Sequence, residues 1–133
     1  MRCPCRKKTE SVTYAACCEP YHRGDAVPVT AETLMRSRYS GFVLKRADYI
    51  LATWHRSTRP PFVNMVADET WLSLKVGDST MDGDTATVTF TARSLIKGQS
   101  QVMHEVSRFV RESGRWFYVR DDARPEPRVP AKS

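Results

Sequence analysis

The stretch that decides the fold is residues 85–93, which read Thr-Ala-Thr-Val-Thr-Phe-Thr-Ala-Arg. Apolar and polar side chains alternate along it with a period of two, the pattern of a strand that buries one face. Ala86, Val88, Phe90 and Ala92 would point inward, with the threonines between them facing outward. β-branched residues favour such a half-buried pleated surface. The stretch therefore predicts a β-strand that covers a core on one side.

The segments on either side of this strand extend the pattern. Residues 71–76 alternate as well, and a turn at residues 81–84 would connect them to the strand at residues 85–93. Their predicted buried face consists of Leu72, Leu74 and Val76. Residues 102–111 fit a helix as well as a strand, because their apolar positions suit both periods. The turn at residues 112–115, followed by the aromatic run at residues 116–119, favours a hairpin.

Helical patterns precede the strands. Thr30 is a suitable N-cap, and apolar residues recur at helical spacing from Leu34 to about Lys45. Asp48 could cap a second, short helix that ends before the two prolines at residues 60–61. The buried stripe of that helix would be Ile50, Leu51 and Trp54. Helices followed by antiparallel strands predict an α+β fold, with the helices packed on one face of a curved sheet.

A different pattern occupies the first eighteen residues, which contain every cysteine of the chain. One pair is spaced Cys-x-Cys and the other is adjacent, so both can fold onto a single ion. The four candidate ligands are Cys3, Cys5, Cys17 and Cys18. Four thiolates form a closed tetrahedral zinc site, which holds structure and has no open position for chemistry. The alternative is a set of free thiols, and His22 is a reserve ligand that we expect to lie outside the site.

Composition limits the classes of protein that the sequence can encode. The chain has 133 residues, a formal net charge of +6 and a charged fraction of 27%. No apolar run approaches the roughly 20 residues of a membrane helix, so we expect no membrane partner. No apolar stretch follows the initial Met-Arg-Cys-Pro, which favours a cytoplasmic protein. The net positive charge permits contact with nucleic acid. The sequence contains no run of five like charges, so nucleic-acid binding is not favoured.

The cysteine region resembles a SEC-C motif. Cys3-Pro-Cys5, Tyr14, Cys17-Cys18 and Pro20-Tyr21-His22 carry the resemblance, and the motif implies zinc. The segments at residues 34–40, 48–59 and 107–118 resemble the YchJ-like (UPF0225) family, so the likeness spans roughly residues 1–121. The motif usually has Gly-Ser-Gly after its second cysteine and about eight residues before its last pair. Here Arg6-Lys7-Lys8 and eleven residues stand in those places.

The resemblance implies a division of the chain and a fold for its larger part. It implies a zinc knuckle at residues 1–22, a linker at 23–29 and a nuclear transport factor 2-like domain at 30–121. Such a domain is a cystatin-like cone, a curved sheet wrapped around helices. Residues 122–133 contain several prolines and few apolar groups, which predicts a disordered tail.

A conical fold of this kind often encloses a pocket, and the sequence offers candidates for its lining. They are Tyr39, Trp54, His55, His104 and Arg108, with Asp48, Tyr49 and Glu105 as further titratable groups. If residues 102–110 form a strand, His104 and Arg108 share a face with valines, which is also the setting of an ordinary rim histidine. Candidates for contact with an anion or a partner are Arg6, Lys7, Lys8, Arg36 and Arg38.

The sequence leaves several functions open. It favours a zinc-binding protein of uncharacterised role that uses the knuckle to contact a protein partner. The alternative is a small-molecule binder or enzyme that uses the pocket of the cone. A weaker alternative is RNA binding through the basic knuckle. No Ser-His-Asp order, Walker loop or dinucleotide fingerprint is present, which favours a protein that is not an enzyme.

Overall fold

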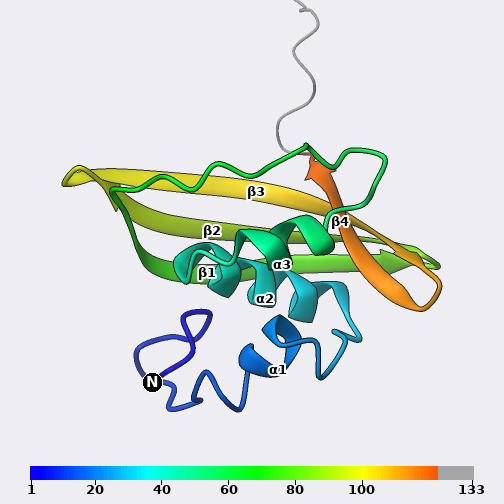
Figure 1. Cartoon of the computed structure of the whole chain (residues 1–133), viewed down its shortest axis with the longest axis horizontal. Helices are drawn as coiled ribbons and strands as arrows, with labels where there is room; N and C mark the ends of the chain where they lie inside the picture. The colour runs from blue at the N-terminus through cyan, green and yellow to red at the C-terminus, as the bar shows by residue number, and fades with distance from the viewer. Residues whose placement is uncertain (123–133) are drawn as a thin grey trace, which may run out of the picture.

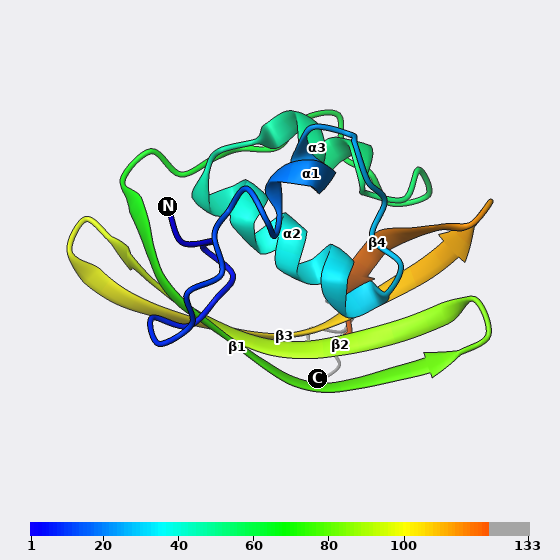
Figure 2. The same cartoon turned by 90° about the horizontal axis from the view of Figure 1, so that it is seen from below.

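The computed structural model describes residues 1–122, and Figure 1 shows its elements. Four antiparallel strands form one sheet in the order β1-β2-β3-β4, so each strand pairs with the next along the chain. The strands are β1 (Glu69–Asp82), β2 (Thr85–Ile96), β3 (Gln99–Glu112) and β4 (Arg115–Asp121). The helices are α1 (Glu19–His22), α2 (Ala31–Val43) and α3 (Ala47–Ala52). All three helices lie on one side of the bent sheet (Figure 2). This is the predicted α+β class.

The central strand confirms the alternation of the sequence. The side chains at positions 86, 88, 90 and 92 are all buried, and those of the intervening threonines are at least partly exposed. Phe109 of β3 and Trp116 of β4 join them in the same core. The concave face of the sheet is therefore apolar, and α2 covers it.

The first strand departs from its predicted pattern. A β-bulge between Trp71 and Ser73 shifts the pairing with β2, so that Trp71 lies opposite Ser94 and Ser73 opposite Arg93. The extra residue, Leu72, is 46% exposed, and the prediction that it shares the buried face is wrong. Trp71 instead turns toward α2, where its ring meets that of Tyr39 edge-on at 5.6 Å. A bulge shifts the alternation of inward and outward side chains by one residue. Sequence periodicity alone does not reveal where such a shift occurs.

The hairpin of β3 and β4 is confirmed. Ser113 and Gly114 form its turn with φ angles of 52° and 78°, the left-handed conformation that two-residue hairpin turns require. Phe109 lies on the concave face and is fully buried. Val102 is 58% exposed, so the apolar positions of β3 do not all share one face.

Helix α2 begins and ends close to the predicted residues. Helix α3 ends at Ala52, well before the two prolines, so Trp54 lies outside it and only Ile50 of the predicted buried stripe is fully buried. Thr30 caps α2, since its hydroxyl accepts a hydrogen bond from the Thr33 amide at 3.1 Å. The predicted cap of the short helix is wrong: Arg46 occupies the N-cap of α3, and Asp48 lies inside the first turn. There Asp48 suits the helix dipole, and its hydrogen bond with Arg46 lowers its pKa.

Two expectations concern the ends of the chain and the membrane. The predicted disordered tail at residues 122–133 lies outside the described residues, apart from Asp122. Asp122 pairs with Arg108 at 2.8 Å and with Arg120 at 2.9 Å. None of the helices between residues 1 and 122 combines the length and the apolar character that crossing a bilayer requires.

Candidate metal centre

The backbone of the first 22 residues brings the two cysteine pairs together. The amide of Cys3 donates to the Val12 carbonyl at 2.9 Å, and the amide of Tyr14 donates to the Met1 carbonyl at 2.8 Å. These bonds flank a short antiparallel bridge and fix one side of a loop. The second pair lies at the start of α1, where Cys18 is the N-cap. Loop and helix therefore present their sulfur atoms to a common centre.

The four sulfur atoms have the spacing of a tetrahedral thiolate site. The Sγ–Sγ distances are 3.7 Å for Cys3–Cys5, 3.6 Å for Cys5–Cys17, 3.9 Å for Cys17–Cys18 and 3.7 Å for Cys5–Cys18. All four atoms lie within 4.8 Å of one another. A zinc–sulfur bond of about 2.3 Å in a regular tetrahedron separates the sulfurs by about 3.8 Å. The residues present therefore fit a metal ion held by four cysteines.

The thiols strongly perturb one another. Hydrogen bonds from Cys18 and Cys5 lower the pKa of Cys3, while hydrogen bonds with Cys3 and Cys5, together with burial, raise the pKa of Cys18. One thiolate can thus be stabilised by protons on its neighbours, whereas four adjacent thiolates would repel. A bound cation removes that repulsion and allows all four to deprotonate.

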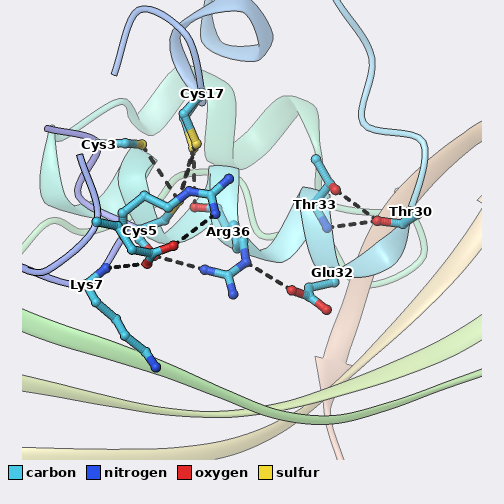
Figure 3. Close-up of polar contacts among 11 residues, drawn as sticks. Cys3, Cys5, Lys7, Cys17, Thr30, Glu32, Thr33 and Arg36 are labelled. Atoms are coloured by element: carbon cyan, nitrogen blue, oxygen red, sulfur yellow. Dashed lines mark hydrogen bonds and ion pairs between the residues drawn. The ribbon is translucent and has the colours of Figure 1, made fainter. Parts of the chain in front are cut away.

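Helix α2 supports the site from the side of the core (Figure 3). The Ser40 hydroxyl lies 3.5 Å from the Cys3 sulfur, and the Cys18 sulfur lies 3.8 Å from the Arg36 carbonyl. The Arg36 guanidinium donates to the Cys5 carbonyl at 2.9 Å and pairs with Glu32 at 3.0 Å. Cys3, Cys5 and Cys18 are buried in the same apolar cluster as the core of the cone. The cysteine region is thus docked on α2.

The His22 side chain is buried beside the cysteines, and its ring nitrogens do not point at them. Its Nδ1 lies 2.7 Å from the Tyr14 hydroxyl, and its Nε2 lies 2.7 Å from the Ser37 carbonyl. Burial lowers its pKa, so the neutral ring donates from Nε2 to the carbonyl and accepts at Nδ1 from Tyr14. Its ring also contacts that of Tyr49 of α3 at 4.6 Å.

The basic residues predicted as partner contacts fall into four settings. Lys7 and Lys8 are exposed, and Arg6 is half-buried between Glu10, at 3.6 Å, and Cys17. The Cys17 sulfur raises the pKa of Arg6. Arg36 is occupied by the contacts described above, and Arg38 is buried inside the cone. A groove of about 490 Å³ runs between the cysteine loop and β1. Its charged lining residues are Arg2, Arg6, Lys7 and Lys8.

The cone encloses a second hollow, a cavity of about 310 Å³ between α2 and the concave face of the sheet. Tyr39 and Trp54 line it, as does Arg38. The other lining side chains are mostly aromatic or apolar and include Trp71, Phe90, Phe109 and Tyr118. Glu105 and Ser107 of β3 contribute the polar groups of the sheet wall.

Five pocket candidates do not line this cavity: Asp48 and Tyr49 of α3, and three further residues. His104 and Arg108 lie on the opposite face of β3 from Glu105 and Ser107, because side chains alternate along a strand. His104 lies 3.1 Å from the Thr91 hydroxyl, and Arg108 pairs with Asp122. Trp71 and Ser107 are lining residues that sequence reasoning missed. The bulge in β1 hid the first, and the second would have followed from its alternation with Phe109.

His55, the third, belongs to a hydrogen-bonded chain outside the cavity. Its Nδ1 accepts from the Ser57 hydroxyl at 2.7 Å, and its Nε2 lies 3.0 Å from a carboxylate oxygen of Glu112. The Ser57 amide also donates to Nδ1, at 3.2 Å, which assigns the ring proton to Nε2. The His55 amide donates to the Tyr118 carbonyl at 2.8 Å. The chain fastens the segment after α3 to the hairpin of β3 and β4.

These features define the class of protein: a nuclear transport factor 2-like cone with a four-cysteine SEC-C knuckle ahead of it. The family model for the middle NTF2-like domain of YchJ matches residues 30–121. A UPF0225 protein from Polaromonas naphthalenivorans is 47% identical over 130 residues, covering 90% of this chain and 96% of its relative. One from Xanthomonas campestris is 51% identical over 128 residues, covering 92% and 93%. The chain belongs to the YchJ-like (UPF0225) family.

Solved structures agree with this assignment. The solution structure of a SEC-C motif containing protein from Rhodopseudomonas palustris superposes with a TM-score of 0.81 at 32% identity, covering 94% of this chain and all of that one. The crystal structure of a SEC-C motif containing protein from Psychrobacter arcticus gives 0.73 at 28% identity, covering 98% and 84%. Both solved structures share the fold over most of this chain, and both are described as SEC-C motif containing proteins.

Proposed function

We propose that the four cysteines hold one zinc ion and that the ion is structural. The observation that supports this is the set of Sγ–Sγ distances, which match a zinc–thiolate tetrahedron. Cysteine thiolates are soft ligands that favour zinc over magnesium or calcium. Four protein ligands leave no position for a water molecule, so the ion stabilises the knuckle and takes no part in chemistry.

Native mass spectrometry on protein purified without added metal or chelator tests this proposal. We expect one zinc per chain, released on acidification as the thiolates take up protons. The control is Lys8→Ala, an exposed change in the same loop, which should retain full occupancy. Metal-free protein with four reactive thiols would contradict the proposal and would mean that the longer loop after Cys5 prevents binding.

We further propose that the zinc-held knuckle contacts a protein partner through the groove between the cysteine loop and β1. Among the described residues, four cationic side chains and no carboxylate line this groove, and one of the four, Arg6, pairs with Glu10 beside it. Trp71 and the exposed Leu72 supply an apolar side. A groove with one sign of charge and an apolar wall suits an acidic peptide segment that carries apolar side chains. The expected occupant is therefore an acidic stretch of a partner protein.

Charge reversal tests the groove. The double variant Lys7→Glu, Lys8→Glu should weaken binding of a fluorescent acidic peptide at least tenfold at low salt, because both cations face the groove. Arg115→Glu, at the exposed start of β4 and outside the groove, is the control. Stronger binding of single-stranded RNA than of the peptide, with a steep salt dependence, would instead assign the groove to nucleic acid.

A second function is favoured by a separate observation, the cavity inside the cone. Its volume of about 310 Å³ lies at the lower end of the range of small-molecule sites, and its lining is largely aromatic with a few polar groups. We propose that it binds a small molecule. The groove and the cavity share Tyr39 and Trp71, so the two functions would meet at these side chains.

A further inference from the structure

We propose that the cavity of the cone takes an apolar monocarboxylate of about ten non-hydrogen atoms, with its carboxylate bound by Arg38. This inference rests on the second function above and adds the class of ligand. It is carried by the position of Arg38, which reaches into the cavity from the middle of α2. The size follows from the cavity volume, since one non-hydrogen atom needs roughly the 30 Å³ of a liquid water molecule.

Arg38 is a buried cation without a carboxylate partner in residues 1–122. Its Nη1 donates to the Ile50 carbonyl at 2.8 Å and to the Thr53 hydroxyl at 2.6 Å. Its guanidinium also lies over the rings of Tyr118, at 4.5 Å, and Trp54, at 5.2 Å. Neutral oxygens and ring faces hold the side chain in place but do not neutralise it. A buried charge of this kind is costly unless an anion compensates it.

Part of the guanidinium stays available to a ligand. Among the described residues, Nε and Nη2 have no hydrogen-bond acceptor, and neither atom is sealed from solvent. Because Nη1 is held by α3 and the two rings fix the plane, the remaining edge presents donors in a set geometry. The planar fork of arginine matches the two oxygens of a carboxylate.

Glu105 on the sheet wall is compatible with a carboxylate nearby. One of its oxygens accepts hydrogen bonds from Ser107 and from Tyr118, the latter at 3.1 Å. Burial raises the pKa of Glu105, and the charge of Arg38 opposes that rise. The remaining charged lining residues are Lys45 and Glu69. No carboxylate between residues 1 and 122 forms an ion pair with Arg38, so its free edge is open to a ligand.

The rest of the lining selects an apolar body. Phe90, Phe109 and Met103 contribute the sheet wall, and Phe42 and Trp71 also line the cavity. Apolar contact with these side chains contributes affinity without orientation, while the carboxylate fixes the direction of entry. An aliphatic chain and an aromatic ring both suit such walls, so octanoate and phenylacetate are the two probes.

The test compares octanoate with 1-octanol and octylamine on the full-length chain, using the indole N–H resonances of its three tryptophans. Trp54 and Trp71 line the cavity, while Trp116 does not and serves as an internal reference. We expect octanoate to shift the first two resonances and to bind at least tenfold more tightly than octanol or octylamine. Phenylacetate in place of octanoate distinguishes an aromatic from an aliphatic source of the carboxylate.

Two outcomes overturn the proposal in different ways. Octanol binding as tightly as octanoate, or octylamine more tightly, would keep the small-molecule function and reject the carboxylate. Failure of all four probes to shift Trp54 and Trp71 would reject the function itself. Arg38→Met should lower octanoate affinity at least tenfold and leave octanol affinity unchanged, whereas Arg93→Met, at an exposed arginine of β2 outside the cavity, should preserve both. The probe comparison on the unmodified chain decides the matter even where Arg38→Met does not fold.

Discussion

The cysteine knuckle and the sheet of the cone are ordered by different means. Residues 1–22 contain one helix of four residues and a single bridge, and their buried atoms are mainly sulfur and the His22 ring. The sheet has long paired strands and a continuous apolar face. A segment of some twenty residues cannot build a sufficient core alone, so we expect the knuckle to depend on a bound ion and on docking, while the sheet depends on apolar burial.

The comparison also shows where the two regions join. Arg36 and Ser40 of α2 contact the cysteine loop, and Tyr49 of α3 contacts His22. The knuckle is not an appendage on a flexible linker, since three of its cysteines lie in the shared core. Loss of the ion should therefore be felt in the cone, while damage to the cone need not empty the metal site.

The largest effect should follow from removing the ion. Cys18→Ser takes away a buried ligand, and structural zinc in finger peptides is worth about 10 kcal/mol or more. We expect residues 1–22 to lose their structure and the melting temperature of the remaining sheet to fall without collapse of the fold. Amide spectra and thermal melts with and without chelator measure both, with Lys8→Ala as the control. Complete unfolding of β1 to β4 would show that the two regions form one unit.

A change in the cone tests the opposite direction. Phe109→Ala removes a fully buried ring from β3, and such truncations cost about 3 to 5 kcal/mol. We expect a large fall in the free energy of unfolding by denaturant, with unchanged zinc content in the folded protein. Val102→Ala on the exposed part of the same strand is the control. Zinc loss from the folded variant would contradict the separate sources of stability.

The contacts between the knuckle and α2 should contribute less to the free energy of unfolding than the ion or the buried Phe109 ring. Arg36→Ala removes the hydrogen bond to the Cys5 carbonyl, which should cost about 1 to 2 kcal/mol because the guanidinium is only partly exposed. Glu32→Gln removes the ion pair alone and should cost less than 1 kcal/mol. Zinc release to a chelator should be faster in the first variant than in the second. Equal rates would show that α2 does not support the site.

The smallest effect concerns Glu105, whose pKa is raised above 4.5, first by burial. The folded state therefore holds this proton more tightly than the unfolded chain, so the stability contribution is present at low pH and declines as pH rises past 4.5. The Glu105→Gln variant lacks this decline. Its melting temperature, compared with that of the unmodified chain, should therefore become relatively higher as the pH rises from about 4 to about 7. Asp68→Asn is an exposed control. A difference that stays constant with pH would contradict a buried, protonated carboxyl.

The cysteine cluster was predictable because it rests on residue type and spacing. Cysteines at positions 3, 5, 17 and 18 are close in sequence, so few loop conformations separate the pattern from the cluster. The hairpin turn at Ser113-Gly114 was predictable for a similar reason, since its conformation is local. The N-cap of α3 was not predictable, because Asp48 is suited both to the N-cap and to the first turn of a helix. Tertiary packing decides which of these two positions it occupies.

The cavity could not be read from the sequence in the same way. Its lining draws on α2, on the segment after α3 and on the concave face of the sheet. The bulge at Leu72 turns Trp71 inward through pairing with β2, which is an interaction between strands. His104 and Glu105 are neighbours in sequence, yet strand pleating puts only Glu105 on the concave side.

The sequence by itself determined the α+β class, the alternation of β2 and the cluster of four cysteines, because periodicity and short-range spacing are local properties of the chain. Tertiary structure alone decided that the knuckle docks on α2, that Arg38 is buried without a carboxylate partner among the described residues, and which face of β3 meets the cavity. These outcomes depend on contacts between residues far apart in the chain. Such contacts are selected by how the elements pack together, and no single segment encodes them.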